Sequence, residues 1–157
     1  MKDILASLNK KPDNYDAIIL CDGSGTIYEK SSGWAAYLFL TTTPSVLKIM
    51  KGGMNCGTNN LAEMMPIFQS LWYLRNLNSN QKYRILVLSD SEWMIKCGNG
   101  EYAINTDGAN QMIWSAIKSI ENYWFYKIEW FHVSRNSTKY HKLCHDTANS
   151  IRKSIGE

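Results

Sequence analysis

The sequence predicts an α/β fold in which helices cover a mixed five-stranded sheet, and three observations support this prediction. The first part of the chain holds three apolar, β-branched runs joined by short connections rich in Gly, Ser, Thr and Pro. Two further apolar runs follow, each after a segment with helical spacing of hydrophobic residues. Another helical segment ends the chain. This order suits three antiparallel strands followed by two parallel ones.

The strands are expected where apolar residues run continuously or alternate. They cover 15–21, which reads YDAIILC, then about 33–43 and 45–53, and later 83–90 and 125–133. The first run has no polar alternation, which is typical of a strand buried on both faces. A turn-rich stretch, DGSGTIYEKSSG, is expected to follow it.

Four helices are expected after the third strand. The first begins near Asn60, a candidate N-cap, with Glu63 at the capping-box spacing three residues later. A short helix within 91–100 ends at two glycines, and a third covers about 106–122. The last follows the polar loop VSRNSTKYHK and shows apolar spacings of 4, 3 and 4 residues.

Length and composition fit one soluble domain in the cytoplasm. A chain of 157 residues can bury a single core, and a formal net charge of +3 creates no global basic field for nucleic acid. The four cysteines are far apart without a CxxC pair, which argues against a disulfide framework or zinc knuckle and favours reduced thiols. No apolar run suits a signal peptide or membrane span. We expect a polar leader over 1–14 and one domain over 15–157.

Carboxylates stand at the ends of several expected elements. Asp22 and Asp90 each follow an apolar strand, Glu63 lies at a helix start, and Asp146 lies near the start of the last helix. Singly, these positions are more often turn, cap or solvated residues. If the two strands are parallel neighbours, however, Asp22 and Asp90 lie side by side, which is costly without a cation or shared proton. Four acids together favour Mg²⁺ or Mn²⁺ over zinc.

Four motifs in chain order resemble ribonuclease H of the bacterial HI type. They are DGSG at 22–25, GTNNLAE at 57–63, SDSEWMI at 89–95 and HDTAN at 145–149. The resemblance runs from about Tyr15 to Arg152. It implies the ribonuclease H-like fold, a site for two Mg²⁺ ions with Mn²⁺ as a possible substitute, and cleavage of the RNA strand in RNA–DNA hybrids.

The resemblance also implies roles for individual residues. Asp22 would bridge both ions, Glu63 and Asp90 would hold one ion, and Asp146 would hold the other. The substrate would be contacted by a larger set, which comprises Gly23, Ser24, Thr58, Asn59, Asn60, Glu92, Asn110, Trp114 and Asn136.

Three departures from the family pattern bear on activity. Asn136 stands where the family has a histidine, so slower turnover is expected unless Arg135 or His141 substitutes. Glu92 replaces a common glutamine, and its charge would repel phosphate unless it points away or engages the metal. Only Gly98–Gly108 separates two helices between which longer relatives carry a basic protrusion. Weak hybrid affinity, or reliance on a replication-associated protein partner, is therefore expected of this short form.

Two other functions fit the same residues. A junction resolvase or exonuclease would keep the fold and metals, although the TNN element favours the hybrid. A catalytically weak or silent nucleic-acid-binding module is the other alternative, although a binder of polyanions gains nothing from four clustered acids. His141 and His145, at i and i+4, could hold a metal but lack a third ligand in the sequence. A monomer without membrane contact is the default expectation.

Overall fold

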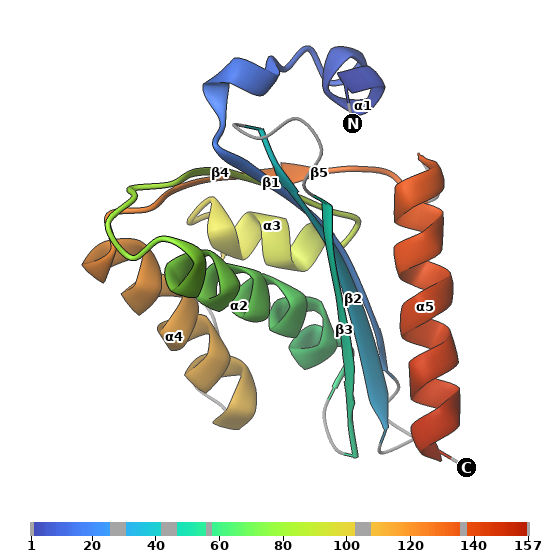
Figure 1. Ribbon diagram of the computed structural model, residues 1–157. Coiled ribbons are helices and arrows are strands. Elements are labelled where there is room, and N and C mark those ends of the chain that lie inside the picture. Colours follow the sequence, from blue (N-terminus) through green and yellow to red (C-terminus); the bar gives the residue numbers. More distant parts are fainter. Residues whose placement is uncertain are drawn as a thin grey trace.

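A computed structural model describes residues 2–25, 31–41, 47–55, 58–102, 108–135 and 138–156. Its strands form one sheet in the order β3-β2-β1-β4-β5 (Figure 1). The pairs β1–β2 and β2–β3 are antiparallel, whereas β1–β4 and β4–β5 are parallel. The mixed sheet expected from the sequence is therefore confirmed. The strands are β1 (Ala17–Gly25), β2 (Ser32–Leu40), β3 (Leu47–Met54), β4 (Arg84–Ser89) and β5 (Lys127–His132).

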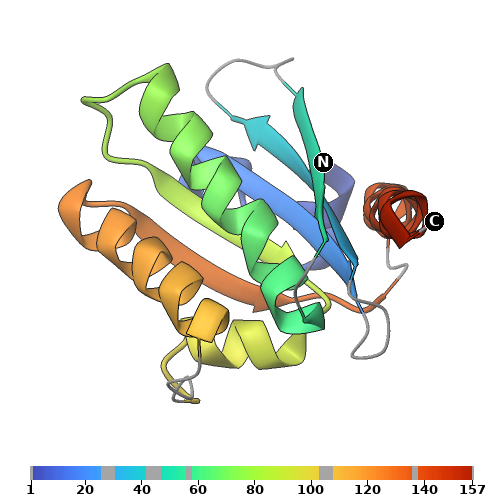
Figure 2. The same cartoon turned by 90° about the horizontal axis from the view of Figure 1, so that it is seen from below.

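Helices lie on both faces of this sheet. Figures 1 and 2 show α2, α3 and α4 on one face and α5 on the other. The bounds are α2 (Asn59–Leu77), α3 (Glu92–Gly98), α4 (Gly108–Tyr123) and α5 (Lys139–Gly156). Before the sheet come α1 (Lys2–Ser7) and a 3-10 turn (Pro12–Asn14).

Strand β1 is buried on both faces, as its apolar run predicted. Ala17, Ile19 and Cys21 belong to the hydrophobic cluster beneath α2 and α4. Ile18 and Leu20 belong to the cluster that includes Cys144 of α5. Because side chains alternate along a strand, Asp22 continues the row that faces α5.

Residues 22–25, which begin the expected turn-rich stretch, are strand, whereas residues 26–30 of that stretch lie outside the described residues. Pairing with β2 continues through Gly23 and ends where Gly25 meets Ser32. Glycine is needed here for close approach, because a Cβ on Gly23 would lie 2.4 Å from the backbone carbonyl carbon of Ala62 in α2. The glycine thus lets the start of α2 pack directly on β1.

Helix α2 begins earlier than the sequence predicted. Thr58 is its N-cap, with an extended backbone and a side-chain oxygen that accepts a hydrogen bond from the Leu61 amide at 3.2 Å. Asn60 lies inside the helix, so its expected role as N-cap is wrong. Glu63 therefore does not close a capping box, and its carboxylate is free to act elsewhere.

The N-terminal segment is anchored to the domain. Leu5 of α1 is buried in the same cluster as Tyr15 and Ile18. Lys10 forms an ion pair with Glu129 of β5. The expected polar leader thus contains a short helix, and Leu5 and Leu8 of this segment pack on the core.

Candidate active site

The parallel pairing of β1 with β4 brings two carboxylates to one end of the sheet. Leu20 is in register with Leu88, and each strand reaches its acid, Asp22 or Asp90, two residues later. Since equal steps along neighbouring parallel strands keep side chains on one face, both acids face α5. Asp22 is fully buried, and the Asp90 side chain is 6% exposed.

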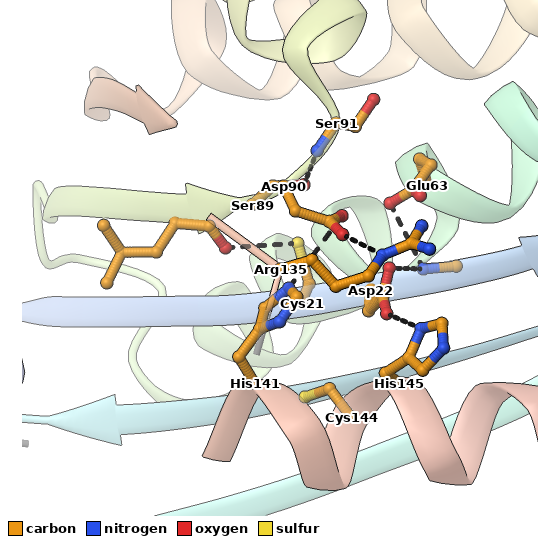
Figure 3. A network of polar contacts seen from close by, with 12 residues as sticks. Cys21, Asp22, Glu63, Ser89, Asp90, Ser91, Arg135, His141, Cys144 and His145 are labelled. Carbon is orange, nitrogen blue, oxygen red and sulfur yellow. Dashed lines mark hydrogen bonds and ion pairs between the residues drawn. The ribbon is translucent and has the colours of Figure 1, made fainter. Parts of the chain in front are cut away.

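A third carboxylate enters from α2. Glu63 is 3% exposed, and its Oε2 accepts a hydrogen bond from the Gly23 amide at 3.2 Å. The same amide lies 2.9 Å from Oδ1 of Asp22. One backbone N–H therefore joins two of the acids, and Figure 3 shows Asp22, Glu63 and Asp90 converging.

Basic side chains surround this group of acids. Nδ1 of His145 in α5 lies 2.8 Å from Oδ2 of Asp22. Arg135 donates from Nε to Oδ2 of Asp90 at 3.1 Å, and Nε2 of His141 lies 3.9 Å from Oδ1 of Asp90 (Figure 3). Both residues that the sequence offered as substitutes for the family histidine, Arg135 and His141, thus lie at Asp90.

The burial of these groups changes their protonation. Burial, reinforced by the charge of Asp90, raises the pKa of Asp22 to about 6 against the hydrogen bond from His145. Burial, followed by the charges of Asp22 and Asp90, also raises the pKa of Glu63 well above its usual value. Each charge is therefore costly in the metal-free protein. Desolvation lowers the pKa of His141, which favours the neutral imidazole.

This donor set fits a divalent cation. Asp22, Asp90 and His141 each offer a ligand atom, and these atoms lie within 4.8 Å of one another. Buried carboxylates are tolerated where they are paired or bind metals, and oxygen donors suit Mg²⁺ and Mn²⁺. Asp22, Asp90 and His141 therefore have the spacing that one ion needs, and Glu63, which shares the Gly23 amide with Asp22, would be a further ligand.

The structure does not bring Asp146 into this group. Asp146 is exposed on α5, whereas its neighbour His145 contacts Asp22. Consecutive residues of a helix point about 100° apart, so the two side chains cannot face the same point. A role for Asp146 as metal ligand stays a prediction from the sequence, and the geometry favours His145 at that place.

A chain of hydrogen bonds fixes His145 from behind. Its Nε2 lies 3.0 Å from Nδ2 of Asn149, and Oδ1 of Asn149 accepts from the Ser24 hydroxyl at 2.5 Å. Arg152 in turn donates to the Ser24 oxygen at 2.9 Å. The Ser24 hydroxyl thus contacts α5, and its expected contact with substrate stays a prediction.

Other residues expected to bind substrate come from two helix starts. The Thr58 hydroxyl lies 3.4 Å from Oδ1 of Asn110, so the first turns of α2 and α4 are neighbours. Asn59 is exposed and Asn60 is partly exposed on the first of these turns. Trp114, one turn further along α4, is half-buried, and its ring centroid lies 5.5 Å from that of Trp130.

The remaining departures have different outcomes. Glu92 is paired with Lys96 at 3.0 Å on the surface of α3, with its side chain 68% exposed. This ion pair lowers the pKa of Glu92 and offsets the charge that was expected to repel phosphate. Asn136 lies outside the described residues.

The RNase H family model matches residues 14–143. The chain belongs to the RNase H family. The match ends before His145, so the family assignment does not test which residue of α5 joins the acids. A search of curated protein sequences returned no match.

Solved structures similar to this RNase H family member share its fold. LC11-RNase H1, solved in complex with an RNA/DNA hybrid, aligns with a TM-score of 0.75 and 16% identity over 88% of this chain and 97% of that one. The N-terminal RNase H domain of rv2228c from Mycobacterium tuberculosis was solved as a fusion with maltose-binding protein. It aligns with a TM-score of 0.72 and 18% identity over 88% of this chain and 94% of that one.

A viral protein extends this likeness. The foamy viral protease-reverse transcriptase, in complex with RNA/DNA hybrid, aligns with a TM-score of 0.70 and 14% identity over 92% of this chain and 21% of that one.

Within the part of the chain that the structure describes, no helix is both long and apolar enough to span a membrane.

Proposed function

We propose that this RNase H family member is an endoribonuclease of the HI type that cleaves the RNA strand of RNA–DNA hybrids with two divalent metal ions. The observation that carries the proposal is the convergence of Asp22, Glu63 and Asp90 from β1, α2 and the end of β4. When bound, two divalent ions would supply an activated water and would offset charge on the attacking and leaving oxygens. Mg²⁺ is the proposed cofactor, with Mn²⁺ as a substitute.

The protein contributes a rigid arrangement of the acids. The Gly23 amide holds the Asp22 and Glu63 carboxylates, and in the metal-free protein Arg135 contacts that of Asp90. Since these groups sit on strand ends and a helix, little reorganisation is needed at the moment of reaction. Burial of Asp22 and Glu63 also excludes bulk water, which strengthens their interaction with a cation.

Recognition of the hybrid is assigned to the first turns of α2 and α4. Asn59, Asn60 and Asn110 offer amide donors and acceptors close to one another, which suits contacts to 2′-hydroxyls and phosphates in a wide minor groove. Trp114 borders the same region and offers a flat apolar surface to a sugar. Selection of RNA on one strand would depend on these side chains.

Several finer features of the proposal rest on the sequence. A cytoplasmic location is proposed because the spacing of the cysteines favours reduced thiols. A monomer is proposed because it is the default for this fold. The short connection between Gly98 at the end of α3 and Gly108 at the start of α4 supports weak hybrid binding or help from a protein partner. Such binding should weaken steeply with salt, because phosphate contacts release counterions.

The test is cleavage of an end-labelled hybrid with Mg²⁺ or Mn²⁺, beside matching single-stranded RNA and duplex DNA. Internal RNA cuts only in the hybrid are expected, and Asp22→Asn should abolish them. An Asn136→His variant should cleave faster than the unmodified protein. Cutting of four-way junctions or DNA ends instead of the hybrid would redirect the assignment to a resolvase or exonuclease.

A silent nucleic-acid-binding module is the second candidate, and one observation favours it. Arg135 and His145 already contact Asp90 and Asp22, so part of the acidic charge is offset without metal. A metal titration separates the two functions. A silent module should bind the hybrid equally with and without Mg²⁺, and it should leave the RNA uncut.

A further inference from the structure

Helix α5 presents a nitrogen atom, and not a carboxylate, to the acidic group. His145 Nδ1 lies 2.8 Å from Asp22 Oδ2, and the imidazole is 24% exposed whereas Asp22 is buried. The ring therefore lies between solvent and the central acid. A group in that place contacts Asp22 from the side of α5.

The separation of these two atoms suits a shared metal ion. Two adjacent ligands of an octahedral ion with bonds of about 2.1 Å lie about 3 Å apart. Nδ1 of His145 and Oδ2 of Asp22 are already close to that separation. Small side-chain movements would let both bind one cation.

The contacts behind the ring fit the same role once the Asn149 side-chain amide is turned over. A metal-binding histidine almost always donates from its second ring nitrogen to a fixed acceptor. If the Asn149 side-chain amide is turned over, its Oδ1 accepts a hydrogen bond from Nε2–H of His145. Its Nδ2 then donates to the Ser24 oxygen, which also accepts from Arg152. In that state Nδ1 carries no proton, and its lone pair points toward Asp22. In the present orientation Nδ1–H donates to Asp22, so a turn of one amide separates the two states.

We propose that His145 is a metal ligand that, together with Asp22, holds a divalent ion on the α5 side of the site, and that this nitrogen ligand makes that one position bind Mn²⁺ more tightly than Mg²⁺, which is the cofactor proposed for the carboxylate position. The proposal rests on the metal dependence proposed above. Mg²⁺ takes oxygen ligands, whereas Mn²⁺, although the weakest binder of the first transition row, accepts an imidazole nitrogen beside its carboxylate ligands. Asp146 is exposed, and His141 is fully buried beside Asp90, so neither side chain shares the position of His145.

The test is electron spin-echo spectroscopy of the Mn²⁺-loaded protein, because a directly bound imidazole gives a ¹⁴N coupling. The chain has three histidines, which allows a complete set of matched variants: His145→Asp, His141→Asn and His132→Asn. The ¹⁴N coupling should disappear only in His145→Asp, which still binds Mn²⁺ through oxygen. Titration calorimetry should show that the same variant loses the preference for Mn²⁺. Asn149→Ala should weaken Mn²⁺ binding by about 10-fold, since loss of an orienting contact has that effect.

Other results would overturn the proposal. Bound Mn²⁺ without ¹⁴N coupling would exclude a histidine ligand, and a coupling lost only in His141→Asn would assign the ligand to His141. Neither result would affect the proposed hydrolysis. Failure of the protein to bind Mn²⁺ at all would overturn both this inference and the metal-dependent function. If His145→Asp does not fold, His145→Gln gives the same comparison with a neutral side chain.

Discussion

Replacing Asp22 by Asn should stabilise the metal-free protein at neutral pH. The pKa of Asp22 is raised from its ordinary value of 3.8 to about 6, mainly by burial. This difference is roughly 2 units, and at about 1.4 kcal/mol per unit the ionised carboxylate costs the fold about 3 kcal/mol. An amide of the same shape carries no charge and removes that cost. The gain is an upper value, because Asn presents an N–H₂ group to His145 or to the Gly23 amide.

The sign of the effect depends on pH in a defined window. A carboxyl group whose pKa is raised on folding binds its proton more tightly in the folded state. Its cost to stability is absent below about pH 4, grows between about pH 4 and 6, and is complete above about pH 7. The gain from Asp22→Asn should therefore be small in acid and largest at neutral pH.

Urea unfolding with a chelator at about pH 4 and pH 7.5 measures this difference. Asp146→Asn is the matched control, because Asp146 is exposed, and a change within about 0.5 kcal/mol is expected at both pH values. Adding Mn²⁺ should reverse the order, since the unmodified protein gains stability from the ion that it binds. An Asp22→Asn variant that is equally destabilised at both pH values would refute the reasoning, because Asp22 would then stabilise the fold through its hydrogen bonds.

Three further predictions concern the surroundings of the site. Gly23→Ala should lower the free energy of unfolding by about 3 kcal/mol or more and should weaken metal binding. The reason is that the added Cβ would overlap the backbone of α2 at 2.4 Å. An unchanged melting temperature would contradict this prediction. Glu92→Gln should change the hybrid Kd by less than about twofold, since Lys96 already offsets the charge; tenfold tighter binding in a filter assay would show that the carboxylate faces the phosphates. Arg135→Gln should raise metal affinity by up to about fivefold in calorimetry, because the ion pair between the exposed Arg135 side chain and Asp90, worth about 1 kcal/mol, no longer competes with the metal. A lower affinity would mean that Arg135 orients Asp90 for the ion.

The sheet could be predicted from the sequence because its apolar runs are long and its connections short. The prediction that Asp22 and Asp90 lie side by side needed only the parallel pairing of two strands, and the register of Leu20 with Leu88 supplies it. Less predictable was the end of β1, where turn-forming residues continue the strand. Close approach of α2 decides that conformation, and the contact is made by a residue 40 positions away in the chain.

Helix phase explains why the residue of α5 at the acids was harder to predict. At 3.6 residues per turn, His145 lies about 40° around the helix from the buried His141, whereas Asp146 lies about 140° away. The buried Cys144 and Ala148 mark the same inward side, so the spacing of these residues already carried the signal. The sequence does not reveal how α5 is rotated about its own axis. The close contact between the backbone of Gly33 in β2 and Ala148 fixes this rotation. A Cβ added to Gly33 would lie 2.2 Å from the Ala148 carbonyl oxygen. This contact between distant parts of the chain turns His145, and not the acid beside it, toward Asp22.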